Sequence, residues 1–91
     1  MSDVGADLTT LKTLHKTFVE KAQTALDTKS AITSAVGSAQ WKGNYATQFK
    51  TAWEQYATNL TNLHNALTDA AHDVKANHNN IAAATGMPDR I

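Results

Sequence analysis

The chain from Asn44 to Thr85 contains neither glycine nor proline, and its apolar residues recur at alternating steps of four and three. This spacing places them on one face of a long α-helix. All of the recurring positions except Asn77 are apolar or aromatic, so the pattern predicts a seam that packs against another helix, as in a coiled coil. The positions are Phe49, Trp53, Tyr56, Leu60, Leu63, Leu67, Ala70, Val74, Asn77 and Ile81.

The first half of the chain carries a similar but wider stripe, which predicts a second amphipathic helix. Leu14, Val19 and Leu26 lie beside this stripe, and the added width indicates contact with more than one neighbouring helix. Asp3 or Asp7 is expected to cap its start. The stripe consists of Leu8, Leu11, His15, Phe18, Ala22, Ala25, Lys29, Ile32 and Val36.

The segment between the two stripes has the composition of a loop, with two glycines, a serine and an asparagine between Gly37 and Asn44. Gly37 is expected to end the first helix in a left-handed conformation, and Gly43 to adopt a turn conformation. Asn44 is the expected N-cap of the second helix. A loop this short makes the helices antiparallel, so the fold class is all-α, an αα-hairpin.

These patterns divide the chain into three parts. Residues 1–6 are an N-terminal segment, and residues 7–85 form the hairpin, with helices at about 7–36 and 44–85 and a loop at 37–43. Gly86 and Pro88 are expected to stop the second helix, which leaves 86–91 as a short mobile tail.

Composition excludes several functional classes. The chain has 91 residues, which is one domain, and its eight basic residues balance eight acidic ones. Zero net charge disfavours a nucleic-acid binder and attraction to acidic membranes. Without cysteine there is no disulfide. The sequence shows no membrane-spanning run and no Sec signal, so we expect synthesis in the cytoplasm and no stable membrane insertion.

The length of the two helices indicates that the hairpin binds a partner. A second helix of this length would extend about 60 Å, and two such rods leave much of each apolar stripe in water. Exposed stripes of this kind mark protein interfaces. A second hairpin would cover them, so we expect a dimer in the form of a four-helix bundle.

Trp41-Lys42-Gly43 stands in the bend between the helices. Together with the length and the hairpin, this Trp-x-Gly motif resembles the WXG family, the early-secreted-antigen-like small proteins of type VII (ESX) secretion. The resemblance covers the whole chain. It implies a secreted, virulence-associated, non-enzymatic protein that leaves the cell without a Sec signal. It also implies contact with the type VII secretion ATPase and pairing with itself or with a paralogous WXG protein.

Trp41 has two compatible interpretations. Its ring could fold back to cover the end of the bundle, or it could help to form a surface that the secretion machinery reads. Gly43 would allow the chain to turn closely into the second helix.

The family's C-terminal export signal, Tyr-x-x-x-Asp/Glu, is not found in this sequence. Its tyrosines are Tyr45 and Tyr56, and the residues four positions later are Phe49 and Leu60, which are not acidic. The resemblance therefore implies that a partner supplies the signal or that a divergent signal is used.

The polar residues suggest no catalytic site, metal site or cofactor. His15, His64, His72 and His78 lack the three- or four-residue spacing of helical metal ligands. Lys29 and Asn77 occupy seam positions, where they could fix register or partner choice, or could reach water where the helix ends splay apart. Asp69 and Asp73 are expected on a solvated face rather than in acid–base catalysis.

Two other functions fit the same hairpin. A cytoplasmic adaptor or chaperone-like protein would use the same seam to bind its clients. A membrane-active bundle would insert its amphipathic helices into lipid, although the many polar residues and the zero net charge disfavour it.

Overall fold

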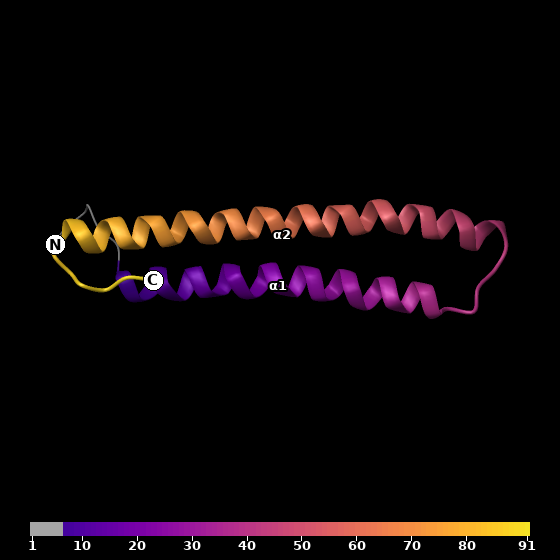
Figure 1. The fold of residues 1–91 in the computed structure, drawn as a ribbon, viewed down its shortest axis with the longest axis horizontal. Coiled ribbons are helices and arrows are strands. Elements are labelled where there is room, and N and C mark those ends of the chain that lie inside the picture. The colour runs from indigo at the N-terminus through magenta and orange to yellow at the C-terminus, as the bar shows by residue number, and fades with distance from the viewer. Residues whose placement is uncertain (1–6) are drawn as a thin grey trace.

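The computed structural model describes residues 7–91, which fold into two antiparallel helices, α1 (Leu8–Ser38) and α2 (Asn44–Ala84). The helices lie side by side along their length and are joined by a bend at one end (Figure 1). The hairpin measures 65 × 17 × 16 Å, so it is a rod rather than a globule. The expected fold class, an all-α hairpin, is confirmed.

The start of α1 is capped by Asp7, one of the two expected residues. Its carboxylate accepts hydrogen bonds from the Thr9 and Thr10 amides at 2.8 and 3.4 Å, and these amides have no partner within the helix. Asp3, the other expected cap, lies outside the described residues.

The end of α1 differs from the expected one. The helix passes through Gly37 and stops at Ser38, and Ala39 then leaves it in an extended conformation. The Ala39 amide donates to the Ala35 and Val36 carbonyls, which closes the last turn without a left-handed residue. The conformational freedom of Gly37 is therefore not used.

Gly43 is the residue that turns the chain into α2. Its φ of +101° and ψ of −176° belong to a region that is essentially restricted to glycine. Gly43 also occupies the N-cap position expected for Asn44, and no side chain of residues 7–91 caps this end of the helix. Asn44 is instead the first residue of α2, because the turn is completed one position earlier.

Gly86 ends α2 as expected, with a φ of +73°. The tail, which was expected to be mobile, folds back onto the helix. The Ile91 amide donates to the side-chain oxygen of Asn79 at 2.9 Å, and the Asn79 side-chain amide donates to the Ile91 backbone oxygen at 3.2 Å. This pair of hydrogen bonds fixes the tail against α2.

The core between the helices is built from small side chains. The fully buried apolar residues among those described are all alanines, and the largest buried side chain is a histidine, His78. Alanine lets two helix backbones approach closely but removes little apolar area from water. The single hairpin therefore has a thin core. Its buried alanines are Ala22, Ala25, Ala46, Ala57, Ala71 and Ala82.

Three polar side chains tie the helices together and set their register. The His64 Nδ1 donates to the Ala22 carbonyl at 3.0 Å, and the Lys29 ammonium donates to the Thr61 hydroxyl at 2.7 Å. The Trp53 indole N–H donates to the Thr33 hydroxyl at 3.0 Å. Lys29 therefore binds across the seam, whereas Asn77 is exposed and donates to the Asp73 carbonyl of its own helix.

Candidate interaction surface

The apolar stripe of α2 divides into two rows. Residues of the first row recur every seven positions, are half-buried and face α1; they are Trp53, Leu60, Leu67 and Val74. A second set of residues, also seven apart, completes the face that packs on α1. This set is Ala57, His64, Ala71 and His78. The sequence pattern did not reveal the set, because alanine and histidine do not stand out as core residues.

The second row of the stripe lies beside the face that packs on α1. Phe49, Tyr56 and Leu63 recur every seven positions, and between 39% and 54% of each side chain is exposed. Tyr45 stands one turn before Phe49 and is also exposed. A seam with both rows is wider than a single neighbouring helix can cover, so α1 buries one row and leaves the other in water.

Trp41 extends this exposed row around the bend. Its ring centroid lies 5.5 Å from that of Phe49, and the two rings are tilted by 41°. The Trp41 side chain is 43% exposed, so the ring packs against the flank of α2 and does not close the end of the hairpin. The tryptophan and the exposed row therefore form one continuous strip.

Two large side chains of α1 lie on the same side of the hairpin. Leu14 and Ile32 are 18 residues apart, which is about five helical turns, so they share one side of α1. Leu14 precedes the seam residue His15 by one position, just as Leu63 precedes His64 on the antiparallel helix. We define the apolar surface as the exposed residues Leu14, Ile32, Trp41, Tyr45, Phe49, Tyr56 and Leu63.

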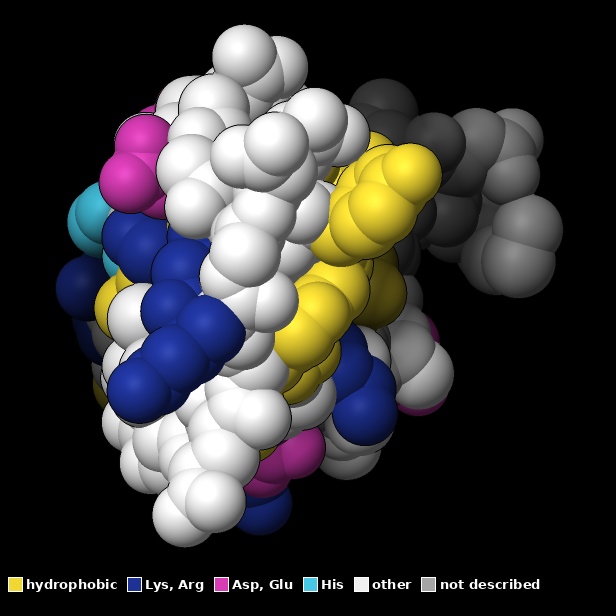
Figure 2. Space-filling model, turned by 90° about the vertical axis from the view of Figure 1, so that its right-hand side faces the viewer, with side chains coloured by type: hydrophobic (Ala, Val, Ile, Leu, Met, Phe, Trp, Pro, Cys, Tyr) yellow, Lys and Arg dark blue, Asp and Glu magenta, His cyan; other side chains and the backbone are white. Residues whose placement is uncertain are grey.

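The opposite side of the hairpin confirms this geometry. A hollow of about 210 Å³ is lined there by Val19, Gln23, Thr68, His72 and Lys75, each of which follows by one position a residue that packs on the other helix. Residues that follow the packed positions thus meet on one side, and residues that precede them meet on the other. Figure 2, which looks onto the bend, shows hydrophobic side chains gathered mainly on one side of this end of the hairpin.

The structure thus places the predicted seam residues in two environments. Seven of them lie half-buried between the helices: Leu8, Leu11, Phe18, Trp53, Leu60, Leu67 and Val74. Ile32, Phe49, Tyr56 and Leu63 lie on the apolar surface, and Trp41 and Gly43 lie in the bend.

The structure also shows where the histidines and aspartates considered as site residues lie. Among residues 7–91, no three His, Asp or Glu side chains come close enough together to hold a metal ion. His15, His64 and His72 line the hollow, whereas His78 is buried under the tail, where its Nε2 lies 3.6 Å from the Asp89 carboxylate. Asp69 and Asp73 are exposed.

Comparison with known proteins shows the family. A family model described as proteins of 100 residues with WXG (WXG100) matches residues 4–84. The chain therefore belongs to the WXG100 family, and its Trp-x-Gly motif is Trp41-Lys42-Gly43 in the bend. Neither the curated proteins nor the solved structures contain a match. In the part of the chain that the structure describes, neither helix is apolar enough to cross a membrane.

Proposed function

We propose that this chain is a non-enzymatic helical subunit of type VII secretion that works as one half of a four-helix bundle. Membership of the WXG100 family supports export by type VII secretion, and the apolar surface supports the pairing of two hairpins in a four-helix bundle. The observation that carries the proposal is the exposed row of α2, which continues into Trp41 of the family motif.

The exposed area of the hairpin supports a partner. A compact monomer of this mass would expose about 5,200 Å², whereas this chain exposes 6508 Å². A stable protein interface buries about 800 Å² on each partner, which the apolar surface and its rim can supply. Because the fully buried apolar residues of one hairpin are alanines, a second hairpin would add contacts between large apolar side chains.

A homodimer is the simpler form of this bundle. Zero net charge gives the chain no need for an oppositely charged mate, so like subunits can pair without repulsion. A paralogous WXG protein remains the alternative partner, and it would explain export of a chain that has no Tyr-x-x-x-Asp/Glu signal. In either form, the type VII ATPase is the proposed motor and the cell exterior the destination.

Measurement of the oligomeric state in solution tests the proposed dimer. Leu63 and Val19 are equally exposed, at 47% and 48%, but lie on opposite sides of the hairpin. We expect light scattering at micromolar concentration to give a dimer for the wild type and for Val19→Lys, and a folded monomer for Leu63→Lys. A wild-type chain that is monomeric and fully folded under these conditions would contradict the bundle.

A secretion assay tests export by the type VII system separately from the dimer. The protein should be present in culture supernatant of the native host and absent when the type VII ATPase gene is deleted. A cytoplasmic protein released by lysis serves as the control. Equal amounts in the two supernatants would contradict a secretion role, even if the dimer forms.

A further inference from the structure

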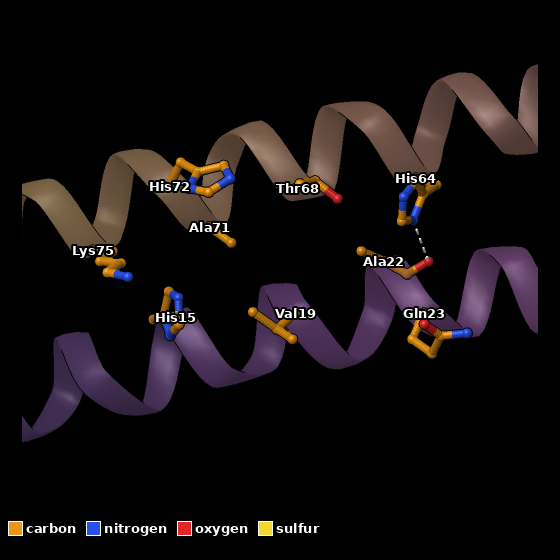
Figure 3. Close-up of a pocket in the computed structure, with 9 residues that line it drawn as sticks. All are labelled: His15, Val19, Ala22, Gln23, His64, Thr68, Ala71, His72 and Lys75. Atoms are coloured by element: carbon orange, nitrogen blue, oxygen red, sulfur yellow. Dashed lines mark hydrogen bonds between the residues drawn. The ribbon is translucent and has the colours of Figure 1, made fainter. Parts of the chain in front are cut away.

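The hollow on the side opposite the apolar surface forms a groove that has the features of a small binding site. It lies between the first half of α1 and the second half of α2, and its volume is about 210 Å³. A cavity of about 150 Å³ is enough to hold a benzene molecule. Nine residues line the hollow: His15, Val19, Ala22, Gln23, His64, Thr68, Ala71, His72 and Lys75 (Figure 3).

The polar groups of this groove are almost all able to donate hydrogen bonds to an anion. His15 of α1 and His72 and Lys75 of α2 stand on opposite walls (Figure 3), and the Gln23 amide and Thr68 hydroxyl add uncharged donors. None of the nine lining residues is acidic. An anion in the groove would therefore meet the Lys75 charge with no opposing carboxylate in the lining.

His64 is held in one orientation at the end of the groove. A carbonyl oxygen can only accept, so the 3.0 Å contact with Ala22 places a proton on the His64 Nδ1. The Nε2 of His64 then becomes a donor only when the ring is protonated. Protonation of His64 would therefore add a charge and a donor to the groove without any change in the position of the ring.

We propose that this groove binds a carboxylate group carried on a short hydrocarbon arm, such as a glutamate side chain of another protein. Lys75 supplies the one permanent charge, which matches one carboxylate better than a doubly charged phosphate. Val19, Ala22 and Ala71 provide an apolar wall for the methylene groups. The groove lies opposite the apolar surface, so this site is independent of the proposed dimer.

Carboxylate binding should tighten as the pH falls. The titratable groups that line the groove are His15 from α1 and His64, His72 and Lys75 from α2. Each imidazole that gains a proton adds positive charge to the groove, which attracts a carboxylate ligand. By linkage, the bound anion favours the protonated imidazoles, so affinity rises as the pH falls.

Nuclear magnetic resonance of the imidazole rings tests the proposal. Three of the four histidines line the groove, and the fourth, His78, serves as an internal reference. We would add sodium acetate at constant ionic strength and constant pH, and acetamide as the uncharged ligand of the same shape. Acetate should produce saturable, millimolar shifts of His15, His64 and His72 but not of His78, which lies outside the groove. The same titration at about pH 6 should show tighter binding than at about pH 8.

Two lysines of α2 provide matched variants. Lys75 lines the groove, whereas Lys50 lies near the bend, and both are exposed, so neither substitution should affect folding. Lys75→Gln should weaken acetate binding by about two- to fivefold, and Lys50→Gln should leave it unchanged. Equal effects of the two variants, equal shifts with acetamide, or no saturation with acetate would each overturn the proposal. Tighter binding of inorganic phosphate than of acetate would overturn the assignment to a carboxylate.

Discussion

Trp41 shows how a family motif can leave its aromatic residue at the surface of a single chain. The sequence allowed the ring either to cover the end of the hairpin or to form a surface for another protein. In the structure it leans on Phe49 at the edge of the apolar surface, with nearly half of its area exposed. Its contribution to the hairpin alone is therefore smaller than that of a buried tryptophan.

Trp41→Ala should lower the free energy of unfolding by about 1–2 kcal/mol, compared with the roughly 3–5 kcal/mol of a fully buried aromatic residue. The measurement is urea denaturation in the monomeric Leu63→Lys background, which separates hairpin stability from dimer stability. A loss above about 4 kcal/mol would show that the ring is buried.

Gly37, in the last turn of α1, and Gly43, in the bend, make a matched pair. A Cβ added at Gly43 or at Gly37 would meet no atom within 4 Å, so the two sites differ in backbone conformation and not in space. Gly43→Ala should destabilise the protein by about 1–3 kcal/mol, because only glycine adopts its backbone angles without strain. Gly37→Ala should stabilise it by about 0.5–1 kcal/mol, since this position is helical. Thermal denaturation of both variants tests the pair.

At the scale of elements, α2 is a helix with more apolar width than α1 can cover. Its inner face alternates half-buried large residues with alanines and histidines, and the alanines set the distance between the helices. The exposed row lies next to this inner face and has no partner in the hairpin. The two helices are thus held closely by small residues while large residues remain available at the flank.

Ala57→Leu should force the helices apart and cost about 1–3 kcal/mol in free energy of unfolding, because the site has no room for the larger side chain. Ala57 is buried against α1, whereas Ala76 lies exposed on the same helix. Ala76→Leu is the control and should change stability by less than about 0.5 kcal/mol in urea denaturation. Similar losses in both variants would show that close approach of the helices at Ala57 is not what holds them.

The whole molecule is a rod 65 Å long whose core is too thin to be very stable alone. Its two long sides differ in character: one carries the apolar surface, and the other carries the groove with its histidines and Lys75. In the proposed dimer, the second hairpin would dock on the first side and leave the second side free. Assembly and the proposed ligand binding would then be compatible with each other.

If the dimer stabilises the fold, the melting temperature should rise with protein concentration. We expect a shift of several degrees per tenfold increase in concentration for the wild type, since dissociation is coupled to unfolding. The monomeric Leu63→Lys variant should melt lower and at a temperature independent of concentration. A wild-type melting temperature that does not change with concentration would contradict this coupling.

The sequence by itself determined the two helices, the bend and the family, because each depends on local signals. Apolar periodicity without interruption makes a helix whatever lies beside it, Asp7 caps its own helix, and Gly43 and Gly86 act on their own backbone angles. The motif in the bend depends only on which residues are adjacent.

Only the tertiary structure decided which half of the α2 stripe faces α1. Both rows carry large apolar residues over the first half of α2, and a rotation of the helix by less than one residue position exchanges them. The choice was made by contacts between distant residues, such as His64 with Ala22 and Lys29 with Thr61, and by alanines that allow close approach. For the same reason the apolar surface and the groove, which depend on the relative rotation of the two helices, could not be predicted from either helix alone.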